Sequence, residues 1–190
     1  MSSRTAQDAK TLARRYYTGQ DVYDVETRNV FFERWIYAGR ASAVSDPGSY
    51  FLCEIESESV IVLKDSDGKL RAHHNVCRHR GTQLLTEPQG QLPKSIQCPY
   101  HAWTYTLDGT LIGAPFMDEV ESFCSDDYPL KPVAVAVWEG CVFICLALEP
   151  EPFEQAFAPL IDKFGSWTMR ELEIAHSISY DVPANWKLIF

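Results

Sequence analysis

Two short strings in the middle of the chain, Cys77-Arg-His79 and Cys98-Pro-Tyr-His101, each supply one thiol and one imidazole, and eighteen residues separate them. A [2Fe-2S] rhomb has two irons with two terminal ligand positions each. In one variant two thiolates hold one iron and two imidazoles hold the other. The sequence therefore predicts a two-iron cluster bound by Cys77, His79, Cys98 and His101, and a fold that brings both loops together.

Zinc is the alternative occupant, because two cysteines and two histidines also make a tetrahedral zinc site. Zinc fingers usually take both cysteines from one knuckle and both histidines from one helix. Here the two residue types alternate along the chain. The alternation favours the two-iron cluster over a zinc-bound interaction module.

The composition is that of a folded chain without a membrane segment. Six cysteines in 190 residues are too sparse for a disulfide scaffold. Residues 1–10 lack the apolar stretch of a secretory signal, and the longest apolar run, 141–148, is far shorter than the roughly 20 residues of a membrane helix. The net charge of −9 disfavours nucleic acid and suits a basic protein partner or simple solubility. We expect a cytoplasmic protein that binds neither nucleic acid nor a membrane.

The middle of the chain has the pattern of an antiparallel β fold. From about residue 38, short β-prone runs alternate with turns, and three of these turns contain a glycine after an acidic residue, which favours tight hairpins. The predicted hairpins cover residues 59–75, 104–112 and 133–148. We expect this β domain to extend over residues 38–150.

The two ends of the chain differ from the middle in the spacing of their apolar residues. Residues 12–37 place apolar side chains at near-helical spacing, with Thr18 and Asp21 positioned like N-terminal caps. They predict a helical arm, which we assign to residues 1–37. Helical spacing returns over Phe153–Phe164, so a new unit should occupy residues 151–190.

Longer strings around the four predicted ligands resemble a known family. Cys77-Arg-His-Arg-Gly81 and Cys98-Pro-Tyr-His-Ala-Trp103 are similar to the two cluster-binding boxes of Rieske proteins. The residues that this resemblance places beside the cluster are Arg80, Gly81, Tyr100 and Trp103. Gly81 is expected to let the backbone approach the cluster closely.

The residues around the boxes indicate the type of Rieske centre. Respiratory Rieske proteins carry an extra cysteine in each box and a serine hydroxyl that bonds a bridging sulfide, and here those places hold Thr82, Tyr100 and Trp103. Fewer hydrogen bonds to sulfur predict a potential near the low end of the range, roughly −150 mV. Such a potential resembles that of the oxygenase class.

Several other residues near the boxes leave alternatives open. Arg78 and Arg80 place positive charge beside the cluster, and Arg80 either is solvated or reaches a carboxylate on a neighbouring subunit. Tyr105 either offers its hydroxyl to a cysteine sulfur or packs in the core. The remaining thiols and imidazoles are expected to bind no metal: Cys53, Cys124, Cys141, Cys145, His73, His74 and His176.

Nearly the whole chain resembles the N-terminal part of the large subunit of Rieske non-haem iron oxygenases. The match includes Tyr16-Tyr17, Phe32-Glu-Arg-Trp35, Leu107-Asp-Gly109 and Asn185-Trp-Lys-Leu188. The resemblance implies a mainly β fold: a Rieske-type antiparallel sandwich or barrel, an N-terminal helical arm, and the truncated start of an α+β catalytic domain. It also implies a homotrimer that takes electrons from a reductase containing flavin and an iron-sulfur centre and using NAD(P)H.

In that family, Asn-Trp-Lys opens the helix whose continuation brings the ligands of a mononuclear non-haem Fe(II). Because this chain ends at Phe190, we expect no catalytic residue within it, and the mononuclear iron only in the full-length enzyme. A stand-alone Rieske ferredoxin-like carrier is the alternative. Ile112-Gly-Ala-Pro115 with Met117 resembles members that act on quaternary ammonium compounds, and aromatic acids are the other substrate class.

Overall fold

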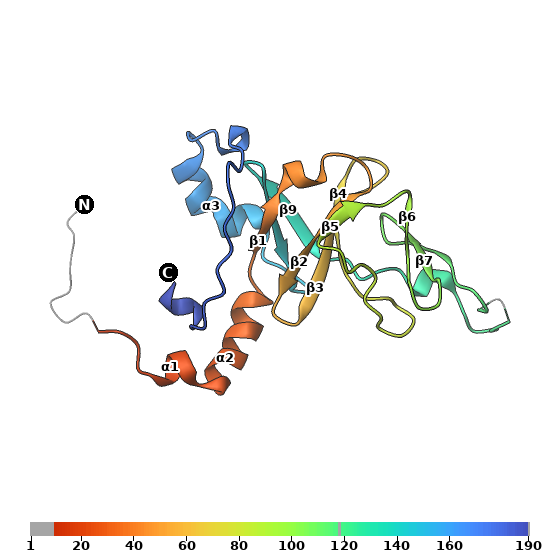
Figure 1. Cartoon of the computed structure of the whole chain (residues 1–190), viewed down its shortest axis with the longest axis horizontal. Coiled ribbons are helices and arrows are strands. Elements are labelled where there is room, and N and C mark those ends of the chain that lie inside the picture. The colour runs from red at the N-terminus through yellow and green to blue at the C-terminus, as the bar shows by residue number, and fades with distance from the viewer. Residues whose placement is uncertain (1–9, 118, 190) are drawn as a thin grey trace.

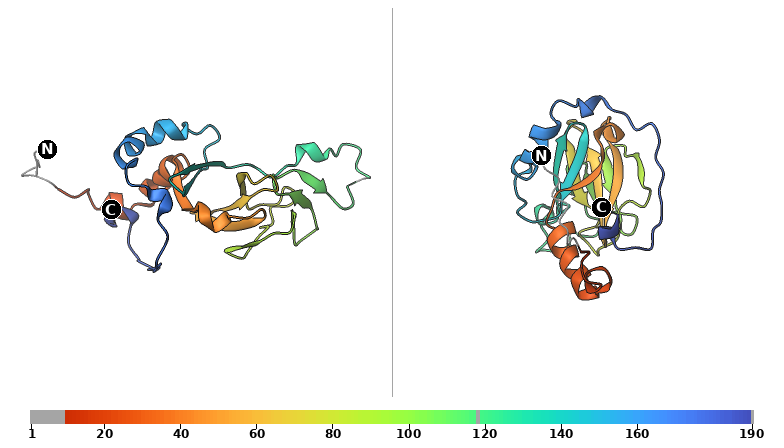
Figure 2. Two further views of the ribbon diagram at one scale, coloured as in Figure 1. Left: turned by 90° about the horizontal axis from the view of Figure 1, so that it is seen from above. Right: turned by 90° about the vertical axis from the view of Figure 1, so that its left-hand side faces the viewer.

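The computed structural model describes residues 10–117 and 119–189. The inference about a secretory signal therefore rests on residues of which 1–9 lie outside the described part. Figures 1 and 2 show an elongated molecule with β sheets in its middle, the helical arm and the C-terminal segment at one end, and the strands β6 and β7 at the other. No helix within the described ranges is long and apolar enough to cross a membrane.

The β domain contains three antiparallel sheets, so the predicted mainly β antiparallel fold is confirmed. The first sheet has the order β1 (Ile36–Arg40), β10 (Cys141–Cys145), β9 (Ala134–Trp138). The second has the order β4 (Leu70–His74), β3 (Glu58–Lys64), β2 (Ser49–Ile55), β5 (Gln89–Gln91). The third has the order β6 (Ser95–Gln97), β7 (Thr104–Thr106), β8 (Leu111–Gly113).

The three predicted hairpins all form, as β3–β4, β7–β8 and β9–β10. In the first of them, one carboxylate oxygen of Asp65 accepts hydrogen bonds from the backbone N–H groups of Asp67 (3.0 Å) and Lys69 (2.8 Å). Gly68 then takes a φ of +75°, which glycine adopts without steric cost. Local turn chemistry therefore specifies this hairpin.

Strand β3 lies at the centre of two apolar cores. Successive side chains of a strand point to opposite faces, so Val60 and Val62 join the core shared with β10, while Ile61 and Leu63 join the core shared with β7. All four are fully buried. The second core also contains Cys77, Cys98 and Trp103, so the two predicted boxes meet between the central sheet and the β6–β8 sheet.

The helical arm is shorter than predicted. Helix α1 (Arg15–Thr18) and helix α2 (Gln20–Glu26) are followed by a π-helical turn, Thr27–Phe31, while residues 36 and 37, which were expected to be helical, belong to strand β1. Pairing of β1 with β10 overrides the helical spacing, because it satisfies the backbone groups along this stretch.

The caps predicted for the arm are also wrong. Gly19 occupies the N-cap of α2, where no side chain makes a cap hydrogen bond. The Thr18 hydroxyl instead donates back to the carbonyl of Arg14. The helix predicted after the β domain is confirmed as α3 (Phe153–Phe164).

The Asn185-Trp-Lys string folds back onto the arm. The ammonium of Lys187 lies 2.7 Å from both carboxylate oxygens of Glu26, and the indole N–H of Trp186 donates to the same carboxylate at 3.1 Å. The ring of Trp186 also packs edge-on against Phe31. These contacts join segments about 160 residues apart in the sequence.

Replacing Lys187 with methionine should lower the free energy of unfolding by about 1 kcal/mol at neutral pH, the value of a bidentate pair near the surface. The hydrogen bonds from Lys187 lower the pKa of Glu26 below its ordinary 4.5. A carboxyl with a lowered folded-state pKa adds stability above the unfolded pKa and loses it as the pH falls through the folded value. The difference between parent and variant should therefore shrink below pH 4.5. Urea unfolding across this range measures it, with the exposed Lys163→Met as control, and a difference that is constant in acid would contradict the ion pair.

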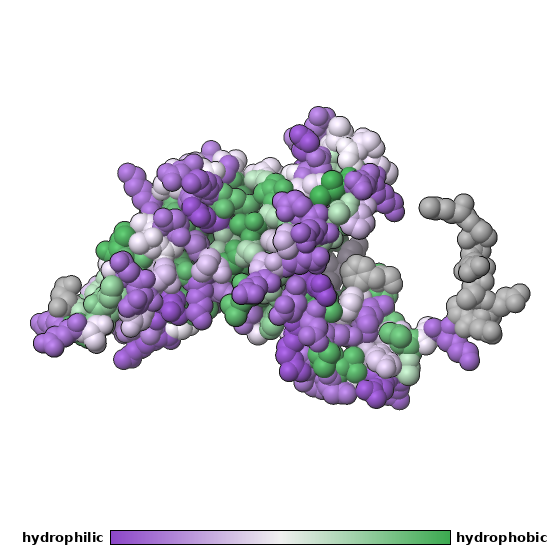
Figure 3. Space-filling model, turned by 180° about the vertical axis from the view of Figure 1, so that it is seen from behind, coloured by the Kyte–Doolittle hydropathy of each residue, from purple (hydrophilic) through white to green (hydrophobic). Residues whose placement is uncertain are grey.

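Apolar side chains are also exposed beyond α3. Large residues at least half exposed follow one another along the C-terminal segment: Leu172, Ile174, Ile178, Tyr180, Val182, Leu188 and Ile189. Figure 3 shows apolar residues interspersed among hydrophilic ones on one face of the molecule.

Candidate functional site

The two predicted boxes fold into loops of the same design. In the first, the N–H of Cys77 donates to the carbonyl of Thr82 (2.8 Å) and the N–H of Gly81 donates to the carbonyl of Cys77 (3.0 Å). In the second, Cys98 and Ala102 make the equivalent bonds, with Trp103 as the acceptor for Cys98 (2.8 Å). Each loop thus closes around its cysteine with the same pair of backbone bonds.

Both loops need a left-handed residue at the fourth position after the cysteine. Gly81 has a φ of +72° and Ala102 a φ of +58°. This backbone conformation favours glycine. It is by itself a sufficient reason for a glycine at position 81, because a Cβ there would meet no protein atom within 4 Å. The close approach of this backbone to a cluster stays a prediction.

The two box cysteines are buried beside each other. Cys77 is 2% and Cys98 3% exposed, and neither is in a disulfide. Burial raises the pKa of the Cys77 thiol, and the adjacent Cys98 thiol raises it further. Two buried thiols without a disulfide are a donor pair that a cationic metal centre would convert to thiolates.

The two box histidines also face each other. Their ring centroids are 4.8 Å apart, and the Nδ1 atoms of His79 and His101 are both buried without a hydrogen-bond partner. Burial lowers the pKa of His79, which favours the neutral imidazole that binds metals. A buried ring nitrogen without a partner is costly, so two such nitrogens beside two buried thiols form a donor set suited to a Rieske-type cluster.

The donors come as two pairs. Within residues 10–117 and 119–189, no three His, Cys, Asp or Glu side chains form a group that could hold a single metal ion. In a two-iron rhomb each iron is coordinated by two protein ligands, whereas a structural zinc ion is coordinated by four ligands around one centre. One pair of thiols and one pair of imidazoles match the first arrangement.

Aromatic side chains pack around the two histidines. The ring of Trp103 stacks on His79 with centroids 4.8 Å apart and only 7° between the planes, and Trp103 is itself buried. Tyr100 lies over His101 with centroids 3.8 Å apart and is 60% exposed. Arg80 is exposed. The predicted neighbours therefore split into a buried support, Trp103, and two surface residues, Tyr100 and Arg80.

Tyr105 does what the first of its two predicted roles requires. Its hydroxyl lies 3.4 Å from the sulfur of Cys77 and accepts a hydrogen bond from the N–H of Arg78 at 3.1 Å. Burial, followed by the contact with Cys77, raises the pKa of the phenol, so the hydroxyl keeps its proton. It therefore has a proton available for the sulfur.

Asn75 is a site residue that sequence reasoning missed. It is fully buried, its amide donates to the carbonyl of Leu85 (2.7 Å), and its oxygen accepts from the N–H groups of Leu84 (3.1 Å) and Leu85 (2.9 Å). It thus fixes the start of the first box to the segment that follows it. In the sequence, the only indication of this role is that a polar amide stands between a predicted strand and the first box, and this pattern is not specific.

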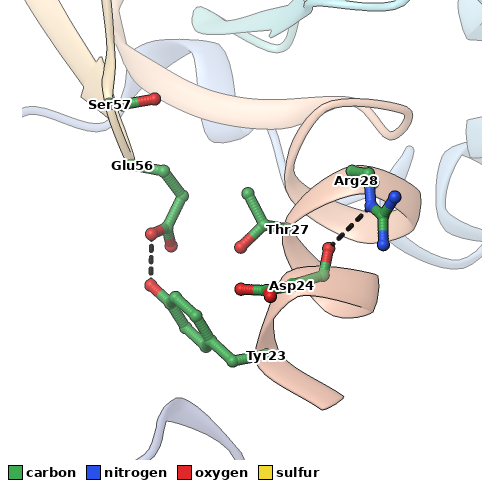
Figure 4. Close-up of a pocket in the computed structure, with 6 residues that line it drawn as sticks. All are labelled: Tyr23, Asp24, Thr27, Arg28, Glu56 and Ser57. Carbon is green, nitrogen blue, oxygen red and sulfur yellow. Dashed lines mark hydrogen bonds between the residues drawn. The ribbon is translucent and has the colours of Figure 1, made fainter. Parts of the chain in front are cut away.

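A separate polar pocket of about 480 Å³ lies between the arm and the β2–β3 turn (Figure 4). The hydroxyl of Tyr23 donates to the carboxylate of Glu56, and Arg28 donates to the backbone carbonyl of Asp24. The pocket is lined by no residue of either box. We interpret this pocket as part of the contact region between the arm and the central sheet.

Comparison with known proteins assigns the family. Residues 34–124 match the model of the Rieske [2Fe-2S] domain. The chain is 35% identical over 186 residues to the glycine betaine monooxygenase oxygenase subunit of Chromohalobacter salexigens (98% of this chain, 41% of the relative). It is 36% identical over 185 residues to the carnitine monooxygenase oxygenase subunit of Escherichia coli K12 (96% of this chain, 49% of the relative). The chain belongs to the Rieske oxygenase family.

The fold agrees with this assignment. The crystal structure of the apo form of a quaternary ammonium Rieske monooxygenase, CntA, superposes with a TM-score of 0.89 at 32% identity, covering 94% of this chain and 52% of that one. The predicted resemblance to the N-terminal part of a Rieske oxygenase large subunit is thereby confirmed. The similarity includes the arm and the segment after the β domain, which favours the oxygenase interpretation over the stand-alone ferredoxin. This Rieske oxygenase chain spans less than half the length of the two curated relatives.

Proposed function

We propose that Cys77, His79, Cys98 and His101 hold the [2Fe-2S] cluster of this Rieske domain. The observation that carries this proposal is the pair of buried, unpartnered Nδ1 atoms beside two buried thiols. The cluster, when bound, takes up and releases one electron at a time. Ligation through Nδ1 leaves the Nε2 atom of each imidazole as a hydrogen-bond donor.

The surrounding residues would keep these ligands in place. Trp103 would fix the ring plane of His79, the Tyr105 hydroxyl would donate a hydrogen bond to the sulfur of Cys77, and Asn75 would anchor the loop. Tyr100 covers His101 on the solvent side, and Arg80 is available to a carboxylate of a neighbouring subunit. Gly81 and Ala102 supply the left-handed turns that close both loops.

The whole protein, we propose, is an oxygenase that passes electrons from this cluster to a mononuclear non-haem iron in another part of the enzyme. The relatives named as oxygenase subunits support this role. Its electrons would come from a reductase with flavin and an iron-sulfur centre that uses NAD(P)H, and the enzyme would be a cytoplasmic homotrimer. Residues 36–150 would form the cluster domain, because β1 begins at Ile36 and pairs with β10. The residues before β1 would form the arm, and 151–190 the start of the catalytic domain.

For the substrate we propose a quaternary ammonium compound such as a betaine or carnitine. The names of the two relatives and the string Ile112-Gly-Ala-Pro115 with Met117 support it. The test is oxygen-dependent consumption of glycine betaine, carnitine or benzoate by the full-length enzyme with its reductase and NAD(P)H. Consumption of benzoate alone would overturn the substrate class in favour of aromatic acids.

The cluster assignment has its own test. Protein purified without oxygen should contain two irons and two labile sulfides per chain and give a Rieske-type EPR signal after reduction. One zinc per chain and no sulfide would overturn the assignment.

Replacing Tyr105 with phenylalanine should lower the reduction potential while the cluster stays bound. A hydrogen bond to a cysteine sulfur stabilises the reduced, more negative cluster. A net bond of 0.5–1.5 kcal/mol corresponds to a decrease of roughly 20–60 mV for one electron. Voltammetry of parent and variant measures this shift, and Tyr37→Phe on strand β1 is a matched control. An unchanged potential would mean that the Tyr105 hydroxyl only packs.

A further inference from the structure

A groove of about 440 Å³ lies beside the first box. It is formed by the start of β3, the end of β4, the first box loop, a residue of the segment that leads into β9 and a residue of the segment that follows β10. Its lining residues include Glu58, Val76, Cys77, Arg78, Lys131 and Leu148. We call it the Arg78 groove.

The Arg78 groove has the opposite charge to the molecule. The chain carries a net charge of −9, yet Arg78 and Lys131 line the groove against a single carboxylate, Glu58. That carboxylate already lies 3.4 Å from the Nδ1 atom of His74. The Nε atom of Arg78 is buried with no hydrogen-bond partner in the structure. The groove is therefore a local positive site that suits a carboxylate.

The rim of the groove also offers apolar contact area. Val76 is 40% exposed and Leu148 is fully exposed. Solvent-exposed apolar side chains beside cationic groups are the combination found where a protein partner docks, because apolar contacts supply affinity and charges supply orientation.

The groove leads directly to one predicted cluster ligand. Cys77 forms part of its wall, and the N–H of Arg78 donates to the Tyr105 hydroxyl, which contacts the sulfur of Cys77. Among the described residues that line the groove there is neither His79 nor His101. A partner in the groove would thus meet the cluster from the cysteine side and leave the histidine side accessible to an acceptor.

We propose that the Arg78 groove is the docking surface for the protein that reduces the cluster, and that an acidic loop of this donor places a carboxylate between Arg78 and Lys131. This inference rests on the proposed function, which supplies the donor. In the step, the donor's reduced centre loses one electron and the cluster gains it, and no bond forms or breaks. The net charge of the chain suited a basic partner or simple solubility, whereas the local charge of the groove selects an acidic partner.

The test uses the full-length oxygenase with the NAD(P)H-dependent reductase that supports its turnover. Lys131→Glu and Leu148→Asp change exposed side chains, so both variants should fold. Each should raise the Kd for the reductase and lower the second-order rate constant of cluster reduction about tenfold at low salt. Dithionite, which needs no docking surface, should reduce parent and variants equally fast. The matched control is Lys69→Glu, which makes the same charge change at the opposite end of β4 and should behave like the parent.

The possible outcomes separate this inference from the proposed function. If the reductase fails to reduce the parent enzyme, while dithionite succeeds, the proposed partner is wrong. If it reduces the parent and both groove variants equally fast and with equal Kd, the docking surface is wrong. If Leu148→Asp instead changes the oligomeric state measured by light scattering, the groove is occupied by another part of the oxygenase, and the inference is again overturned.

Discussion

Replacing Cys98 with serine should remove the cluster and lower the free energy of unfolding by about 3 kcal/mol or more. The side chain of Cys98 is buried in the core between the central sheet and the β6–β8 sheet. Serine keeps the size of this side chain but is a poor ligand for iron, and binding of the cluster stabilises only the folded state. Iron and sulfide content, visible absorption and a decrease in Tm of about 10 °C measure the two effects.

Cys53→Ser is the matched control for this experiment. Cys53 is a half-buried free thiol on strand β2, and burial raises its pKa, so it is a neutral core side chain. The variant should keep full iron and sulfide content. Loss of the cluster from Cys53→Ser, or its retention in Cys98→Ser, would show that the ligand assignment is wrong.

Local sequence chemistry predicted the parts of this fold that depend on neighbours in the chain. The turn that begins at Asp65 closes its hairpin through one carboxylate and one glycine, and the turns at Gly109 and Gly140 likewise have positive φ. The two boxes were found for a similar reason: cluster chemistry dictates both the residue types and their short spacing.

The parts that depend on distant segments were not predictable in this way. Ile36 and Tyr37 end a stretch whose apolar residues have near-helical spacing. They nevertheless form a strand, because β10, about 100 residues later, supplies partners for their backbone groups. The sequence predicted the positive charge of Arg78 beside the cluster, but not that Lys131 lines the same groove, because the two residues are brought together only by the fold. Asn75 is the third case, because its partners belong to a loop that has no pattern of its own.

Replacing Asn75 with alanine should destabilise the domain by about 3 kcal/mol. The change removes the acceptor of the Leu84 and Leu85 N–H groups and the donor to the Leu85 carbonyl. It also removes the bond from the amide to the Ser59 hydroxyl. Each backbone group left unpaired in a buried place costs about 1–3 kcal/mol, although the N–H of Leu84 keeps a longer bond to the Asn75 carbonyl.

The consequence should extend from stability to the cluster. Asn75 lies two residues before Cys77 and holds residues 84 and 85, which close the other side of the first box. Without this amide the loop loses its anchor at both ends, so the iron should be released faster to a chelator while the starting spectrum stays that of the parent. Urea unfolding and the rate of bleaching in excess EDTA measure the two effects. Asn29→Ala, the same substitution at an exposed position of the arm, should change neither.

Asn75→Asp distinguishes hydrogen bonding from side-chain volume. Aspartate fills the same space and still accepts from both N–H groups, but when ionised it cannot donate to Leu85 or Ser59, and it places a charge in a fully buried position. Its loss of stability at neutral pH should therefore equal or exceed that of alanine, and should become smaller in acid, where the protonated carboxyl regains one donor. An aspartate variant as stable as the parent at neutral pH would show that Asn75 acts by filling space, and that the bonds to the loop add little to the stability of the first box.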